Sequence, residues 1–280
     1  MREAWELDVT EIGPIAGGLS VEQIRRRLMT DRVGGHIVLF GEVGSTNDAL
    51  RRRAEQGAAD GTVVLAESQA TGRGRRGKPW FSPAGLNLYA SVLCRPSIPL
   101  SAVPVYTFIT SLAMTDAIGA ERIPAAIKWP NDVLIDGRKA AAALVTCART
   151  RAAPAYVILG AGVNLNVDRA WLETALGPAA AGATSLSEVA GRPIDRNGFA
   201  ATFLNSLERW DDEYRAKGPA GVLAEWRARD ALTGRAVEIR DGERSYCGTV
   251  RGVTDHGRLI VEEADGTHHE VSTGEVVVAR

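Results

Sequence analysis

Apolar residues recur along this 280-residue chain with two different spacings. Short apolar runs predict strands over residues 36–43, 61–66, 86–94, 126–135, 139–146 and 156–163. Helical spacing behind a polar capping residue predicts helices after Ser20, after Ser45 and from Asn197 to about Ala216, and a further helix spans roughly 102–119. Strands therefore alternate with helices through most of the chain, which predicts an α/β fold.

The pattern changes near Leu232. Short strands over 235–240, 246–253, 258–263 and 267–272 alternate there with turns such as Asp265-Gly266. This texture predicts a separate small β domain. The predicted organisation is an N-terminal leader with a short helix (1–35), a large α/β domain (36–231) and a C-terminal β domain (232–280).

Composition limits the classes of function. The chain is 45% hydrophobic with a formal net charge of −1, so it has no global charge for binding nucleic acid or membranes. Its three cysteines are widely spaced, which predicts a reducing compartment without a disulfide framework. Charged residues alternate with apolar ones at the N-terminus, so no signal peptide is expected. No apolar run approaches membrane-spanning length. We expect a soluble, cytoplasmic protein.

A glycine-rich loop at residues 72–80, GRGRRGKPW, carries three arginines and ends on Trp80. Its first part is close to a P-loop, but Pro79 stands where that motif needs Ser or Thr and a helix start, so we reject that interpretation. Guanidinium forks suit carboxylates and phosphates. Taken alone, the loop is better explained as a solvated basic surface loop than as an anion-binding site.

A second segment decides between these two interpretations. Residues 128–132, KWPND, fix one lysine and one carboxylate around a rigid Trp-Pro turn. Together with the glycine-rich loop, this segment predicts a site that holds a carboxylate and a phosphate in contact. Such a site suits an enzyme that joins a carboxylic acid to a nucleotide.

These segments belong to five blocks that occur in order along the chain: Gly44-Ser45-Thr46-Asn47, Ala66-Glu67-Ser68-Gln69 with the loop through Trp80, Asn87-Leu88-Tyr89, Lys128-Trp129-Pro130-Asn131-Asp132, and Gly160-Ala161-Gly162-Val163-Asn164. In this order and spacing the chain resembles the biotin protein ligases over about residues 36–280. The resemblance implies a mixed, largely antiparallel sheet with helices on one face, followed by a small SH3-like β-barrel. It makes residues 36–231 the catalytic domain.

The resemblance also implies an activity. Such ligases adenylate biotin with MgATP, release pyrophosphate, and pass biotin from biotinyl-5′-AMP to one lysine of a biotin carboxyl carrier protein, such as that of acetyl-CoA carboxylase. ATP, Mg²⁺ and biotin are expected as substrates or activator, with no tightly bound cofactor. An acceptor domain is expected to dock along an exposed strand edge, and a homodimer is possible.

Roles follow for the matching residues. Lys128, Arg73 and Arg75 are expected to be catalytic. The ammonium of Lys128 would offset the charge that develops on the α-phosphorus, and Arg73 and Arg75 would bring the biotin carboxylate and the α-phosphate together. Asp132 is the candidate Mg²⁺ ligand, and Asn131 and Asp132 are expected to orient Lys128. The expected biotin or biotinyl-AMP contacts are Ser45, Thr46, Asn47, Gln69, Arg73, Gly74, Arg75 and Lys128. The expected adenylate contacts are Trp80, Asn131, Asp132 and Asn164. For Ser45 to Asn47 a plain helix cap is the competing interpretation, for Trp80 a core indole, and for Asp132 an ordinary turn residue.

The chain departs from the family pattern at two positions. Ala142 stands where a glycine is expected, and Thr146 where a glutamate is expected. A methyl group at Ala142 would crowd the backbone approach to biotin. About 35 residues precede the first predicted strand, too few for the winged-helix repressor domain of some relatives, so we expect a monofunctional ligase. A lipoate or octanoate ligase and a non-catalytic biotin-binding regulator are the alternatives.

Overall fold

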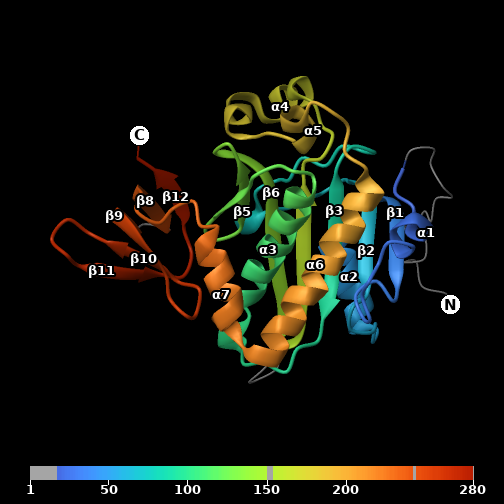
Figure 1. Ribbon diagram of the computed structural model, residues 1–280, viewed down its shortest axis with the longest axis horizontal. Helices are drawn as coiled ribbons and strands as arrows, with labels where there is room; N and C mark the ends of the chain where they lie inside the picture. The colour runs from blue at the N-terminus through green and yellow to red at the C-terminus, as the bar shows by residue number, and fades with distance from the viewer. Residues whose placement is uncertain (1–17, 150–153, 242–243, 280) are drawn as a thin grey trace, which may run out of the picture.

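The computed structural model describes residues 18–149, 154–241 and 244–279, so the predicted leader up to residue 17 lies outside the described residues. These residues form two β-sheets. A seven-stranded sheet with its helices makes up the larger body, and a five-stranded sheet lies beside it at the C-terminal end (Figure 1). The predicted fold class is confirmed.

The larger sheet has the order β1-β2-β3-β7-β6-β5-β4. β1 and β2 run parallel, and the other neighbours are antiparallel. Its strands are β1 (Ile37–Val43), β2 (Val63–Gln69), β3 (Leu88–Cys94), β4 (Ala126–Lys128), β5 (Asp132–Ile135), β6 (Arg138–Arg149) and β7 (Pro154–Val163). The predicted hairpin through Asp136-Gly137 is the connection between β5 and β6, and Gly137 has a positive φ of 74°.

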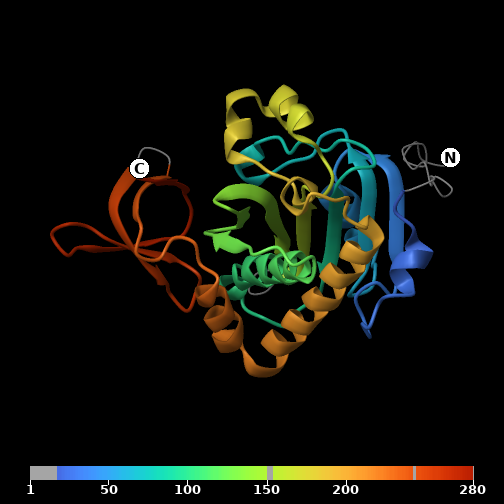
Figure 2. The same cartoon turned by 45° about the horizontal axis from the view of Figure 1, so that its top comes forward.

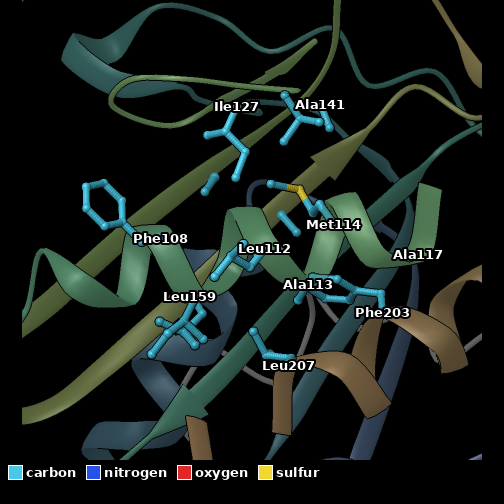
Figure 3. Packing of buried hydrophobic residues seen from close by; sticks show 14 of the residues in the cluster. Phe108, Leu112, Ala113, Met114, Ala117, Ile127, Ala141, Leu159, Phe203 and Leu207 are labelled. Atoms are coloured by element: carbon cyan, nitrogen blue, oxygen red, sulfur yellow. The ribbon is translucent and has the colours of Figure 1, made fainter. Parts of the chain in front are cut away.

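Long helices cover one face of this sheet, as predicted. They are α3 (Val105–Ala120) and α6 (Arg196–Lys217). A third helix, α7 (Pro219–Ala228), was not predicted and packs against both. Figure 3 shows α3 between the strands and α6, with Met114 towards Ala141 and Leu112 near Leu159. The segment Leu100–Ala120 is long and apolar enough to cross a membrane, contrary to expectation. However, 67% of its most apolar stretch is buried inside the protein, as in a core helix.

One helix lies on the opposite face, an arrangement beyond the predicted single layer. Helix α2 (Thr46–Glu55) buries Ala49, Leu50 and Ala54 against Val64 of β2, whereas Val63 packs into the main core. Alternate residues of a strand point to opposite faces, so β2 is covered on both sides. The residues at the start of α2, beginning with Thr46, therefore lie on the sheet face opposite α3.

The helix starts were predicted with mixed success. Ser20 caps α1 (Val21–Arg25), its hydroxyl accepting from the Gln23 backbone N–H at 3.3 Å. Asn197 was wrong as the cap of α6. Asp195 is the cap and accepts from the Asn197 N–H at 3.0 Å. The side-chain Oδ1 of Asn197 instead accepts from the Ser20 N–H at 2.7 Å and ties α1 to α6.

Several elements were not predicted. Between β7 and α6 the chain forms α4 (Arg169–Leu176), a 3₁₀ segment (Gly177–Gly182) and α5 (Leu186–Ala190), which together form a cap above the sheet (Figure 2). Two shorter 3₁₀ turns occupy Arg75–Gly77 and Leu100–Ala102. The Trp129–Pro130 peptide is cis.

The C-terminal sheet, called here the terminal sheet, has the order β11-β10-β9-β8-β12. Its strands are β8 (Ala236–Asp241), β9 (Arg244–Val253), β10 (Leu259–Glu262), β11 (His268–Val271) and β12 (Glu275–Val278). β12 was not predicted. The sheet is attached through its linker, where the Ala231 N–H donates to the Ile127 carbonyl of β4 at 2.9 Å.

Candidate active site

Two adjoining cavities lie on the sheet face opposite α3 and α6. The smaller, of about 40 Å³, is lined by residues from α2, β2, β6 and β7. The larger, of about 340 Å³, is walled by the glycine-arginine loop (residues 72–78), the Lys128–Asp132 turn, the α4 region and β12. Gly74, Trp80 and Ala142 line both. The two segments singled out from the sequence therefore share one cavity.

Uncharged polar groups form much of the smaller cavity. Gln69 Oε1 accepts from the Thr46 N–H at 3.0 Å, and Asn47 Nδ2 donates to the Leu144 carbonyl at 3.0 Å. Ser45 occupies the N-cap position of α2, but its side chain makes no cap hydrogen bond. The plain-cap interpretation of this segment therefore does not describe Ser45.

Ser91 completes this group, and the sequence analysis missed it. Its hydroxyl lies 2.5 Å from Asn47 Oδ1 and 2.8 Å from Thr46 Oγ1, and the residue is fully buried on β3. Thr46 and Asn47 are thereby held from behind by a strand. Ser91 lies opposite Val64 in the β2–β3 pairing, so its role could have been predicted only from the correct pairing of these two strands.

Two glycines of β7 let side chains lie directly on the sheet. A Cβ at Gly160 would meet Asn47 Oδ1 at 2.4 Å, and one at Gly162 would meet Trp80 Nε1 at 2.6 Å. Both distances are shorter than real Cβ contacts, so these positions need glycine. Ala142 pairs with Gly162 across β6 and β7 and is 9% exposed, which puts its methyl group at the junction of the two cavities.

The cations of the glycine-arginine loop divide between the cavities. Arg73 lines the smaller one and pairs with Asp48, whereas Arg75 lines the larger one. The structure therefore does not bring these two predicted clamp residues into the same cavity. Burial, followed by the charge of Arg76, lowers the pKa of the Arg75 guanidinium.

Two lysines line the larger cavity. Lys128, the predicted catalytic residue, forms no hydrogen bond or ion pair with the residues that the structure describes, and its position leaves the ammonium available to a ligand. Lys139, which the sequence analysis did not select, lies with its Nζ 2.6 Å from Asp132 and 5.2 Å from the centre of the Trp80 ring. The predicted hairpin at Asp136-Gly137 could have indicated that Lys139 lies near Asp132, because this hairpin pairs Lys139 with Leu134, two residues after Asp132.

The predicted adenylate contacts line the larger cavity, but some side chains are already engaged. Asn131 Nδ2 donates to the Ala143 carbonyl at 2.7 Å, and Asn164 Nδ2 to the Thr184 carbonyl at 3.0 Å. Asp132 pairs with Lys139 rather than with Lys128. Asn131 and Asp132 therefore do not orient Lys128 in this structure. Leu172 and Leu176 of α4 add an apolar wall that was not predicted.

Two of the five sequence blocks contribute residues with a structural role. Glu67 forms a buried ion pair with Arg196 of α6 at 2.7 Å, and Arg196 Nε donates to the Asn87 carbonyl at 3.0 Å. The Asn87 side chain accepts from the Leu165 N–H at 2.9 Å. These contacts fix β2, β3 and the end of β7 relative to one another.

Comparison with known proteins agrees with this architecture. Residues 40–164 match the biotin/lipoate A/B protein ligase family, and residues 232–278 match the biotin protein ligase C-terminal domain. A biotin–[acetyl-CoA-carboxylase] ligase of Mycobacterium tuberculosis is 35% identical over 85% of this chain and 87% of its own length. The corresponding ligase of Paracoccus denitrificans is 33% identical over 81% of this chain and 95% of its own length.

A solved structure supports the fold. The biotin protein ligase of Aquifex aeolicus, determined in complex with biotin and ATP, superposes with a TM-score of 0.74 at 24% identity, covering 88% of this chain and 99% of that one. Sequence relatives, matched domains and shared architecture agree, and the chain belongs to the biotin protein ligase family.

Proposed function

We propose that this chain is a biotin–[acetyl-CoA-carboxylase] ligase. It activates biotin with ATP to biotinyl-5′-AMP and transfers biotin to one lysine of a biotin carboxyl carrier protein. The observation that carries the proposal is the shared wall of the two cavities. Gly74, Trp80 and Ala142 separate a pocket of mostly uncharged polar groups, which Arg73 also lines, from a larger cavity rich in cations. Membership of the family and the names of its relatives agree with it.

The smaller cavity suits the ureido head of biotin, which offers one carbonyl oxygen and two N–H groups. Ser45, Thr46, Asn47 and Gln69 supply short uncharged donors and acceptors there. Because Ser91 and Leu144 hold Asn47 in place, the amide is oriented before a ligand arrives. The carboxylate tail of biotin would then pass Ala142 towards the larger cavity.

In the first step, a biotin carboxylate oxygen attacks the α-phosphorus of ATP. The bond from that phosphorus to the bridging oxygen breaks, and pyrophosphate leaves. Arg73 and Arg75 bring the two anions together, and the Lys128 ammonium offsets the charge on the α-phosphoryl oxygens. We add Lys139 to this set, because it lines the larger cavity beside Trp80, which lines both cavities.

In the second step, the neutral amine of the acceptor lysine attacks the carbonyl carbon of biotinyl-5′-AMP. The carbon–oxygen bond to phosphate breaks, AMP leaves, and the amine proton is lost to solvent. The same cations stabilise the departing phosphate. Trp80 and the Leu172–Leu176 wall of α4 offer the adenine ring apolar surfaces, beside Asn131 and Asn164.

Mg²⁺ is expected with ATP, and Asp132 is the carboxylate proposed to hold it. Among the described residues no group of three or more His, Cys, Asp or Glu side chains gathers to hold a metal. A single carboxylate fits an ion bound mostly by phosphate oxygens and water, as Mg²⁺ often is. When bound, it would neutralise triphosphate charge. The acceptor is proposed to be the carrier domain of a biotin-dependent carboxylase in the cytoplasm.

Exchange of labelled pyrophosphate into ATP tests the adenylation step. We expect exchange that requires biotin and does not occur with lipoate or octanoate. Exchange with lipoate or octanoate alone would reassign the substrate. Biotin binding without any exchange would identify a non-catalytic regulator instead.

A further inference from the structure

The glycine-arginine loop is attached to the terminal sheet at three points. Arg75 Nη2 donates to the Thr273 hydroxyl at 3.0 Å, Arg76 pairs with Asp241 at 2.7 Å, and Lys78 pairs with Glu275 at 2.9 Å. The partners are 165 to 198 residues apart in the sequence. A loop whose glycines allow many conformations is thus joined to a distant sheet by most of its charged side chains.

Three of the four charged side chains of the loop pair with a carboxylate, and the fourth does not. Arg73 pairs with Asp48, Arg76 with Asp241 and Lys78 with Glu275. Arg75 alone of these four has no carboxylate partner among the described residues, because its contact, Thr273, is a neutral hydroxyl. Burial, followed by the charge of Arg76, lowers the pKa of Arg75. The neighbours of Arg75 are neutralised, and Arg75 keeps a charge that an anionic ligand would satisfy.

We propose that Asp241 and Glu275 are positioning residues for the ligase reaction: by pairing with Arg76 and Lys78 they hold the glycine-arginine loop so that Arg75 faces the larger cavity. This inference rests on the proposed function for its kinetic consequences. Its structural content, that the terminal sheet orders the loop, does not depend on the reaction.

The sheet is a suitable support because it is itself fixed to the catalytic turn. Trp129 Nε1 donates to the Gly257 carbonyl of the β9–β10 turn at 3.0 Å. The Ile127 N–H donates to the Arg229 carbonyl of the linker at 2.7 Å. The loop, the Lys128–Asp132 turn and β12 therefore form one connected frame around the cavity.

Direct contact with nucleotide is a poor alternative role for these two carboxylates. Glu275 lines the larger cavity, where a triphosphate is proposed to lie, and like charges repel. Its carboxylate is instead surrounded by cations: Lys78 foremost, and then Lys128 and Arg76, lower its pKa. Glu275 therefore acts through the cations that it holds.

Glu275→Gln and Asp241→Asn, singly and combined, test the proposal because they remove charge with little change of shape. Glu270→Gln is the matched control, since Glu270 is an exposed carboxylate of the same sheet paired with Arg258 at 3.3 Å, away from the loop. Each exposed ion pair shifts an equilibrium by roughly 1.5- to 5-fold. We expect trypsin to cleave after the loop arginines about 2- to 25-fold faster in the double variant than in the control, with far-UV circular dichroism unchanged.

In pyrophosphate exchange, the double variant should raise KM for ATP by a similar factor and change kcat less. Exchanging the charges, Lys78→Glu with Glu275→Lys, should restore protection from trypsin that either single reversal loses. Cleavage and KM values within twofold of the control, or no restoration by the exchange, would overturn the proposal. Absence of exchange in the wild-type protein would defeat the ligase function, while the cleavage rates would still decide the positioning role.

Discussion

The two cavities of this protein are built in different ways. The smaller one is made from neighbouring strands and the start of α2, and its polar groups are hydrogen-bonded by the sheet behind them. The larger one is assembled from segments far apart in the sequence, including β12 of a separate sheet, and ion pairs hold much of it. A rigid pocket for recognition thus adjoins a charged cavity that depends on distant parts of the chain.

Because of this difference, we expect substitutions in the two cavities to affect different ligands and to depend differently on salt and pH. Changes in the smaller cavity should act on biotin binding through shape and hydrogen bonds, which salt screens little. Changes in the larger cavity should act on nucleotide binding and chemistry through charge, which salt and pH modify. A substitution in one cavity that changed only the binding of the other cavity's ligand would show that the two cavities are not separate in function.

The largest effect is expected from the lysines of the larger cavity. Lys128→Ala and Lys139→Ala should each slow biotin-dependent pyrophosphate exchange by about 10²- to 10³-fold, because each removes a cation placed where negative charge develops. Lys217→Ala, at an exposed lysine paired with Glu213 on α6, is the control. A wild-type rate in Lys128→Ala would remove that residue from the catalytic set and leave the role to Lys139.

A methyl group at Gly160 should damage the smaller cavity selectively. Gly160→Ala would force Asn47 to move, since the new Cβ would lie 2.4 Å from its Oδ1. Overpacking of this kind costs about 1–3 kcal/mol, so we expect roughly 5- to 150-fold weaker biotin binding by isothermal titration calorimetry. Gly119→Ala, at a helical position with nothing within 4 Å, should leave binding unchanged. Equal losses in both variants would contradict the argument.

Removing the Ser91 hydroxyl should have a smaller effect in the same cavity. Ser91→Ala takes away the buried group that contacts Asn47 and Thr46, and a hydrogen bond contributes about 0.5–1.5 kcal/mol. We expect biotin binding to weaken by about 2- to 10-fold, while KM for ATP stays constant. A change in KM for ATP alone would contradict the division between the cavities.

The smallest effect is a loosening of the glycine-arginine loop in acid. Lys78 and the nearby cations lower the pKa of Glu275, so its ion pair stabilises the attached loop at neutral pH. That stabilisation is lost as the pH falls through the folded-state pKa, which lies below the usual range of glutamate. Hydrogen–deuterium exchange of amides 72–78, corrected for intrinsic rates, should rise there in the wild type. Glu275→Gln should remove this rise.

Much of the fold could be predicted because its signals are local. Continuous apolar runs located the central strands, and Asp136-Gly137 located the hairpin between β5 and β6. Helix α7 was missed because Gly218-Pro219 resembles a break, although proline is favoured at the first position of a helix. Asn197 was mistaken for a cap because Asp195, two residues earlier, takes that position.

The site was predicted less completely, for a physical reason. The glycine-arginine loop and the Lys128–Asp132 turn are each contiguous, so their composition indicated anion binding, and the structure places both at one cavity. Lys139, Ser91 and Glu275 reach the site only through strand pairing and the docking of the terminal sheet. Contacts between segments so far apart depend on tertiary structure, which no local pattern in one sequence specifies.

The most direct test of the account is to mix stoichiometric enzyme with biotin and MgATP and to analyse the bound small molecules by mass spectrometry. If the two cavities bring the biotin carboxylate to the α-phosphate, biotinyl-5′-AMP will be recovered with the protein at close to one equivalent, and a carrier domain will discharge it. Binding of both substrates to folded protein without formation of the adenylate would contradict the account.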